Sequence, residues 1–199
     1  MKLLIGTNNK YKLAQYKRVF AEMDLQVEIL SLFDVGIEFD VKEDGDNLLE
    51  NAEKKAREYA ELSGFLTVAD DTGLFVDTLN GEPGIHAKRW HEGNDNDRCL
   101  KLLEKLKNIP PDKRSCKYIG VVAAYDPKEK KLWHTQSEID GLIVDDLRGN
   151  NGFGYDPIFF VKKFGKRFAE LNDSEIDSIS HRTNGAKEFI KKYLDSVKK

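Results

Sequence analysis

Two adjacent carboxylates directly after an apolar run are the residues of this chain with the clearest capacity for chemistry. Asp70 and Asp71 follow the apolar segment 65–69 and precede Thr72 and Gly73. Two charges at the end of a buried strand destabilise a fold unless they are solvated, hydrogen-bonded or metal-bound. One of them can ligate a cation or take a proton from an attacking water, while Thr72 can bond a phosphate. The alternative is a turn in which the Asp70 side chain caps its own backbone.

A polar cluster near the N-terminus has the properties of a phosphate site. The run Thr7-Asn8-Asn9-Lys10-Tyr11-Lys12 lies between an apolar segment, 2–5, and a segment with helical apolar spacing that begins at Lys10. A loop that leaves a strand and enters a helix exposes backbone N–H groups, here beside two lysines. The run lacks the glycines of a Walker A loop and of a Rossmann turn. Its alternative is an ordinary helix cap with solvated lysines.

An acidic segment could supply a metal ligand. Glu43, Asp44 and Asp46 precede a helix predicted from about residue 48, and Glu50 and Lys55 lie within that helix. Mg²⁺ takes one or two carboxylates and leaves its other positions to water and substrate phosphates. Glu43 together with a carboxylate from elsewhere would therefore suffice. The alternative is a solvated acidic loop that favours a helix N-terminus.

The segment Gly152-Phe153-Gly154-Tyr155-Asp156-Pro157-Ile158-Phe159 is typical of a pocket for a flat ring. Its aromatic residues Phe153 and Tyr155 can stack on a base, and its glycines let the backbone approach a ring closely. Asp156 can distinguish the exocyclic groups of that ring by hydrogen bonding. The alternative is a turn with no ligand.

Ser180-His181-Arg182 leads into the last predicted helix, which starts at about Thr183. The planar fork of Arg182 can donate to the 6-oxygen of a purine, with His181 as a second donor. An amino group at that position offers no comparable acceptor, so such a site favours inosine or xanthosine over adenosine. In the alternative, both side chains are exposed at the start of a helix. Lys88, after Pro83-Gly84, could neutralise a polyphosphate, although exposed lysines are common.

Length and charge narrow the class of protein. The 199 residues can form one compact domain, 1–199, and the net charge is -3. Without a basic excess, a free nucleotide is a better ligand than a nucleic-acid polymer. Cys99 and Cys116 read as reduced thiols. The N-terminal apolar run is too short for a signal peptide, and no run approaches a membrane span, so we expect a cytoplasmic protein without a membrane partner.

The elements that must position these residues follow from apolar periodicity and predict an α/β protein. We expect strands at 2–5, 27–32, 65–69 (resuming at 74–76), 116–125 and 131–144, the last two as an antiparallel hairpin, and a turn at 79–84. We expect helices from 10, from 48 to about 63, from 95 to about 107 with Asn94 or Asp95 as the cap, and from about 183.

Taken in order, these clusters resemble the inosine triphosphate pyrophosphatase family, and the likeness covers nearly the whole chain. The family motifs are matched by Thr7 to Lys12, Glu50-Asn51-Ala52, Asp70 to Leu74, Pro83-Gly84, Phe153 to Phe159, Ala169-Glu170-Leu171 and Ser180-His181-Arg182. Each motif alone is modest, but the ordered set is highly specific.

The resemblance implies hydrolysis of non-standard purine nucleoside triphosphates (ITP, dITP, XTP) to monophosphate and pyrophosphate. It implies an elongated α/β fold with a mixed central sheet flanked by helices, two lobes with the active cleft between them, a homodimer, and Mg²⁺ as cofactor. It also implies roles for residues: Asp71 as proton acceptor and metal ligand, Glu43 as the other metal ligand, Thr7, Asn8, Asn9, Lys10, Tyr11, Lys12, Lys55, Thr72 and Lys88 on the phosphates, and Phe153, Gly154, Tyr155, Asp156, His181 and Arg182 on the base.

The chain departs from the family pattern at three places. Ile176 stands where the family usually has a lysine, and Gln15 stands where it usually has an acidic residue. The usual Ser-Ala-Arg after Pro-Gly is Ala87-Lys88-Arg89. These departures leave two other functions open: a nucleotide pyrophosphatase of broader specificity, and a nucleotide-binding protein without turnover.

Overall fold

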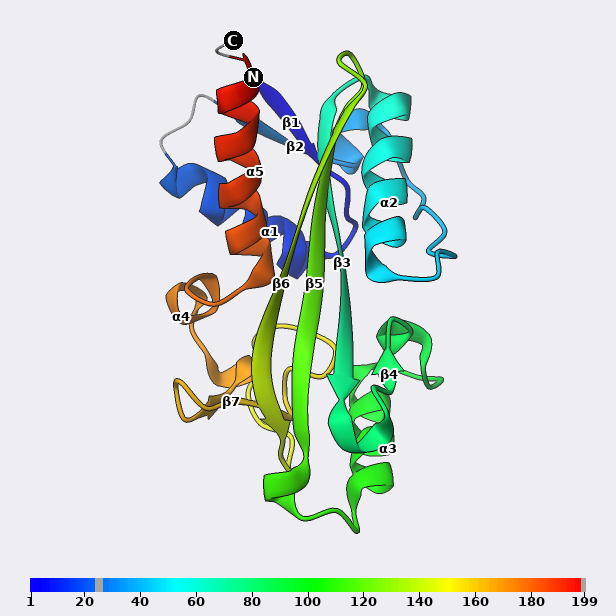
Figure 1. Cartoon of the computed structure of the whole chain (residues 1–199), viewed down its shortest axis with the longest axis vertical. Coiled ribbons are helices and arrows are strands. Elements are labelled where there is room, and N and C mark those ends of the chain that lie inside the picture. The colour runs from blue at the N-terminus through cyan, green and yellow to red at the C-terminus, as the bar shows by residue number, and fades with distance from the viewer. Residues whose placement is uncertain (24–26, 198–199) are drawn as a thin grey trace. The chain divides into compact units, whose positions relative to one another are not determined.

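The computed structural model describes residues 1–23 and 27–197, and it has the predicted α/β architecture (Figure 1). One sheet of eight strands has the order β2-β1-β3-β5-β6-β7-β8, with β4 paired to β3. Parallel pairs at β1 and antiparallel pairs at β4, β7 and β8 make it a mixed sheet. No helix within the described ranges combines the length and apolar character that a membrane span needs. The prediction of a mixed α/β sheet flanked by helices is confirmed.

The chain divides into two compact units. The first comprises residues 1–71, 120–137 and 179–199, and the second comprises 72–119 and 138–178. Strands β3 (Leu66–Val76), β5 (Ser115–Asp126) and β6 (Lys131–Ile143) each contribute residues to both units. The length of the chain predicts one domain over residues 1–199. The division into two units does not decide whether they form a single domain, and the single domain stays a prediction.

The first unit contains the parallel strands β2, β1 and β3, with helices on both faces. Apart from its parts of β3, β5 and β6, its elements are β1 (Lys2–Ile5), α1 (Lys10–Glu22), β2 (Glu28–Ser31), α2 (Leu48–Ser63) and α5 (His181–Val197). Successive side chains of a strand point to opposite faces. Leu3 and Ile5 accordingly pack in a core with residues of α1 and α5, whereas Leu4 packs in a second core with Tyr59 of α2. These cores fix the end of β1 and the first half of β3, next to which the polar residues lie.

The helices of the first unit begin where side chains satisfy the free N–H groups of their first turns. Asn9 caps α1 and Asn47 caps α2, each through its side-chain oxygen. Gly64 ends α2 with φ at 74°, a conformation that glycine adopts without steric cost. The predicted start of α1 and the predicted start and end of α2 are confirmed.

The second unit builds its sheet from short strands. β4 (Pro83–Gly84) pairs with β3, β7 (Phe159–Val161) pairs with β6, and β8 (Lys166–Arg167) pairs with β7. Its helices are α3 (Asp95–Leu106) and α4 (Asp173–Asp177). Asn94 caps α3 in a capping box with Asp97. The sequence predicted either Asn94 or Asp95 as this cap, and the first of these is confirmed.

Three boundary predictions are corrected. β3 runs without a break through Asp70 to Gly73, so the expected stop and the turn capped by Asp70 are wrong. The reason is that both carboxylates find cationic or amide partners and can therefore remain in a buried strand. The last helix starts at His181 and not at Thr183, and the expected turn at 79–84 contains the short strand β4.

Candidate active site

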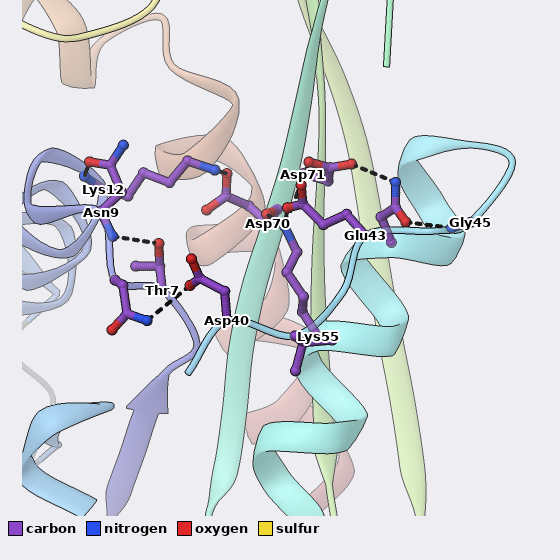
Figure 2. Close-up of polar contacts among 12 residues, drawn as sticks. Thr7, Asn9, Lys12, Asp40, Glu43, Gly45, Lys55, Asp70 and Asp71 are labelled. Carbon is purple, nitrogen blue, oxygen red and sulfur yellow. Dashed lines mark hydrogen bonds and ion pairs between the residues drawn. The ribbon is translucent and has the colours of Figure 1, made fainter. Parts of the chain in front are cut away.

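The Thr7–Lys12 loop is held open in a fixed shape by its own side chains. Thr7 Oγ1 accepts a hydrogen bond from the Asn9 N–H at 3.2 Å. Asn9 Oδ1 accepts from the N–H groups of Tyr11 (2.9 Å) and Lys12 (3.3 Å). The sequence offered an ordinary helix cap with two solvated lysines as the alternative to a phosphate site. The helix cap is present, but only one of the two lysines is exposed to solvent. Lys10 is exposed, whereas Lys12 points back toward β3 (Figure 2).

Asp70 binds two cationic side chains of the first unit, those of Lys12 and Arg182, and we call it their anchor. Its side chain is 0% exposed, and its Oδ2 accepts from Lys12 Nζ at 2.7 Å and from Arg182 Nε at 3.1 Å. Tyr16 donates its hydroxyl to Oδ1 at 3.3 Å. Burial alone would raise the pKa of Asp70, but the charges of Arg182 and Lys12 outweigh it and hold that pKa well below its usual range. Asp70 is thus a permanent anion that joins the Thr7–Lys12 loop to the start of α5.

Asp71 lies in a different environment from its neighbour. Asn51 of α2 donates its amide to Asp71 Oδ2 at 3.1 Å, and Lys55 Nζ lies 3.6 Å from Oδ1. Burial raises the pKa of Asp71, with Lys55 opposing the rise and the charge of Glu43 adding to it. A carboxylate whose pKa is raised accepts a proton more readily than Asp70 does. The role of Asp71 as proton acceptor, which the resemblance implied, stays a prediction.

The acidic loop, residues 38–47, is pinned beside Asp71 by the helix that follows it. Asn51 Oδ1 accepts from the Gly45 N–H at 2.8 Å, so one amide holds both the loop and the Asp71 carboxylate (Figure 2). The hydroxyl of Tyr59 accepts from the Val41 N–H at 2.9 Å. These contacts place Glu43, which the sequence predicted as a metal ligand, next to Lys55 at 2.5 Å.

The two loops of the first unit also meet directly. The Asn8 amide donates to Asp40 Oδ1 at 2.9 Å in an exposed contact (Figure 2). The Thr7–Lys12 loop follows β1 and the acidic loop precedes α2, so the contact joins segments that are 32 residues apart. It brings the predicted phosphate loop and the predicted metal ligand Glu43 to the same end of the parallel sheet.

His181 and Arg182 are buried, which excludes the alternative that they are surface residues at a helix start. Their exposed fractions are 4% and 6%. The His181 ring packs on Gly120 of β5, where an added Cβ would lie 2.0 Å from His181 Cδ2. Burial first, and then the charge of Arg182, lowers the pKa of His181 to about 4. His181 is therefore neutral at neutral pH and has one ring N–H to donate.

The second unit contains the predicted base-binding segment. Asp156 is buried and accepts from the Phe153 N–H and from the Tyr118 hydroxyl, both at 2.9 Å. Gly152 has φ at 86°, and a Cβ there would lie 2.2 Å from Asp156 Oδ2, so only glycine fits this turn. Asp156 thus shapes the segment, and its direct contact with a base stays a prediction.

The aromatic residues of this segment are not equivalent. Tyr155 is 3% exposed and donates its hydroxyl to the Ala87 carbonyl at 3.0 Å, whereas Phe153 is half-buried. Tyr155 therefore ties the segment to the turn that carries Lys88, which is exposed. The Gly154 N–H donates to Asp95 Oδ2 at 2.7 Å. Phe153 is the better candidate for stacking on a ring.

The remaining positions are the predicted site residue Thr72 and two residues that differ from the family pattern, Ile176 and Gln15. Thr72 is half-buried and belongs to the second unit. Ile176 is a buried residue of α4, so no charge occupies the position where the family resemblance implies a lysine. Gln15 is buried on α1. Among the residues in the described ranges, no three histidine, cysteine or acidic side chains are grouped as metal ligands.

Three residues of the site escaped the sequence reasoning: Asn51, Asp70 as an anchor, and Asp40. The Glu-Asn-Ala motif marked Asn51 without a role, and its role depends on contacts to residues six and twenty positions away. Asp70 depends on partners 58 and 112 positions away. No local pattern contains such separations, so only the folded chain could reveal them.

Comparisons with known proteins show the family and the fold of this chain. A model of the Ham1 family matches residues 3–192. A dITP/XTP pyrophosphatase of Clostridium perfringens is 41% identical over 205 residues, which cover 99% of this chain and 97% of the relative. The solved Ham1 protein of Staphylococcus aureus is 32% identical with a TM-score of 0.81, covering 98% and 99% of the two chains. A HAM1 protein from Coxiella burnetii is 31% identical with a TM-score of 0.83, again covering 98% of this chain and 99% of the other.

Proposed function

This chain belongs to the Ham1 family, and we propose that it hydrolyses non-standard purine nucleoside triphosphates (dITP, XTP and ITP) to the monophosphate and pyrophosphate. The observation that carries the proposal is the division of roles between Asp70 and Asp71. Adjacent carboxylates have opposite pKa shifts, one anchoring two cations and the other suited to accept a proton. Such pairs of separated pKa values mark acid–base sites.

In the proposed reaction, water attacks the α-phosphorus and the bond from that phosphorus to the bridging oxygen breaks. Asp71 takes the water proton, and Oδ1 is the accepting atom because Asn51 already donates to Oδ2. Pyrophosphate leaves with the bonding electrons. The carboxylate is held by an amide that is itself held by the Gly45 N–H, so its orientation is set before the substrate arrives.

The triphosphate would be bound by the Thr7–Lys12 loop and by the ammonium groups of Lys12 and Lys55. A loop at a helix N-terminus offers N–H groups and a favourable dipole to an anion. Lys12 is fixed by Asp70 at 2.7 Å, so it presents its charge at a defined place. Preorganised cations of this kind stabilise the charge that develops on the leaving group.

Mg²⁺ fits the oxygen atoms that the first unit presents. A Glu43 carboxylate oxygen, an Asp71 carboxylate oxygen and the Asp70 carbonyl oxygen all lie around Lys55 Nζ, and hard oxygen atoms are the ligands that Mg²⁺ takes. Glu43 and Asp71 would hold the ion, with water and substrate phosphates in its other positions. When bound, it would neutralise phosphate charge and orient the leaving pyrophosphate.

Discrimination between purines would come from buried donors. Arg182 is held by Asp70 through Nε, and its guanidinium offers N–H groups to a 6-oxygen but no acceptor to a 6-amino group. The neutral His181 ring has one N–H donor and one acceptor nitrogen, so the discrimination rests on Arg182. Leaving such a donor unpaired disfavours adenine by a factor of order 10⁴ where no water replaces the bond. Exclusion of guanine requires a contact with its 2-amino group, for which we assign no residue.

Two other functions follow from the departures at Gln15 and Ile176. A missing charge at either position favours a pyrophosphatase of broader specificity, and loss of turnover would leave a nucleotide-binding protein. The arrangement of Asp71, Asn51 and Lys55 favours turnover, because a binding protein has no need of a carboxylate with a raised pKa. Homodimer formation and a cytoplasmic location stay predictions.

The test is Mg²⁺-dependent pyrophosphate release from dITP, XTP, ITP, dATP and GTP, with Asp71→Asn as the matched variant. We expect release from the first three and a loss of at least about 10²-fold in the variant, the usual contribution of a general base. Equal release from dATP and GTP would support the broader enzyme. Binding without release in the wild type would support the binding protein.

A further inference from the structure

The ammonium group of Lys55 lies in the middle of the proposed metal site (Figure 2). Its Nζ is 2.5 Å from Glu43 Oε1, 2.7 Å from the Asp70 carbonyl oxygen and 3.6 Å from Asp71 Oδ1. The Lys55 side chain is 9% exposed, so little water competes for these oxygen atoms. An ammonium has three N–H donors, and here three oxygen atoms surround it.

The charges around Lys55 account for its position. Oxygen atoms of Glu43, Asp71 and the Asp70 carbonyl lie within 3.6 Å of its Nζ, and their negative charge holds the ammonium in place. Without it, Glu43 and Asp71 would be two partly buried carboxylates facing each other, which repel. Lys55 therefore does in this structure what a bound cation would do.

We propose that Lys55 is a stand-in cation: its ammonium occupies the place of the divalent ion in the nucleotide-free protein and gives it up when the ion binds. The inference rests on the proposed function for the identity of the site, but not for the competition itself. Glu43 Oε1 cannot accept from Lys55 at 2.5 Å and hold an ion in the same position. Lysine suits this task because its compact charge lies on a flexible stem and can turn to other acceptors.

The competition predicts an order of events. A divalent ion alone must displace Lys55 and deprive the ammonium of its two acceptors and of its ion pair with Asp71, so the ion binds weakly. The phosphates of a nucleotide offer Lys55 new acceptors, and ion and nucleotide then favour each other's binding by the same factor. In this way the carboxylates remain paired at every stage, and a free ion occupies the site only weakly in the absence of substrate.

The test measures binding of Mn²⁺, as a substitute for Mg²⁺, to the nucleotide-free protein by the electron paramagnetic resonance signal of the free ion. Lys55→Met keeps an unbranched side chain, one atom shorter than lysine, and removes the charge. We expect the variant to bind Mn²⁺ at least about tenfold more tightly than the wild type, within the usual range of coupling between sites. Unchanged or weaker binding would overturn the proposal.

Lys54→Met is the matched control. Lys54 precedes Lys55 on α2 and also lies between two carboxylates, Asp44 at 2.6 Å and Glu58 at 3.9 Å, outside the proposed site. Both variants remove one charge from the same helix beside the same loop. If Lys54→Met gains as much affinity for Mn²⁺ over the wild type as Lys55→Met does, the gain comes from the loss of one positive charge anywhere on the helix. That result would overturn the proposal.

A second pair of variants covers the case in which Lys55→Met does not fold. Lys55→Gln keeps N–H donors without the charge and carries the same expected gain in affinity. Lys55→Gln with Glu43→Gln should lose that gain, because a ligand of the ion is removed with the ammonium. A gain that survives the double substitution would place the ion elsewhere and overturn the proposal. Pyrophosphate release is scored separately, so failure of the proposed function does not decide this result.

Discussion

Protonation of His181 should destabilise the fold in a window of mildly acidic pH. The ring is buried beside Asp70, Arg182 and Lys12, with its Nε2 3.9 Å from Asp70 Oδ2. That distance is too long for a strong hydrogen bond. Burial and the positive charge of Arg182 therefore prevail over the attraction of Asp70, and the pKa falls from 6.5 to about 4.

The magnitude follows from linkage between proton binding and folding. Between pH 6.5 and about pH 4 the unfolded chain binds a proton at this histidine and the folded chain does not. The free energy of unfolding therefore has its full value above pH 6.5 and decreases as the pH falls through this window. The difference of the two pKa values corresponds to about 3 kcal/mol. The pKa of Asp70 lies well below 3.8, so its protonation does not contribute there.

The assay is urea denaturation at neutral pH and at about pH 4.5, with the wild type beside His181→Gln. Asp71 acts in the opposite direction, because its pKa is raised in the folded chain. It is present in both proteins, so the difference between them isolates His181. We expect the wild type to lose about 2 to 3 kcal/mol more than the variant. His134→Gln, at an exposed histidine, should behave like the wild type. Equal losses in wild type and His181→Gln would refute the reasoning.

Three further outcomes follow from the contacts of the first unit. Asn51→Asp removes the donor to Asp71, so pyrophosphate release should fall by about 10 to 100-fold in kcat with a smaller change in KM, measured by steady-state kinetics; an unchanged kcat would contradict a positioning role. Tyr59→Phe loses a buried hydroxyl that bonds two backbone groups of the acidic loop, and urea denaturation should show a loss of about 1 to 2 kcal/mol. Gly120→Ala places a Cβ against the His181 ring and should destabilise the chain by about 1 to 3 kcal/mol in the same assay, whereas a neutral result would mean that the ring can move away.

The main strands and helices could be predicted because each presents its apolar residues at a regular period. Periodicity failed where an element was too short to show one, as in β4, β7 and β8, which have two or three residues each. It also failed at Asp70 to Gly73, where local propensity indicates a break. Charge partners from distant segments keep that stretch in the strand.

The candidate site could be predicted in its residue types but not in its connections. The carboxylates, the loop of Thr7 and the Ser180-His181-Arg182 run are all visible as local motifs. The residue pattern alone did not distinguish Asp70 from Asp71, and only the family resemblance assigned Asp71 as proton acceptor. In the structure their different partners shift the two pKa values in opposite directions. The burial of His181 and Arg182 was equally hidden, because a polar run at a helix start ordinarily faces water.

The central claim is that Asp71 directs water to the α-phosphorus, and hydrolysis of dITP in ¹⁸O-labelled water with Mg²⁺ tests it most directly. Mass spectrometry of the two products shows which of them acquires the label. The account predicts that the nucleoside monophosphate carries the ¹⁸O and that pyrophosphate carries none, with both products reduced in Asp71→Asn. Label in the pyrophosphate would mean attack on the β-phosphorus and would contradict the account.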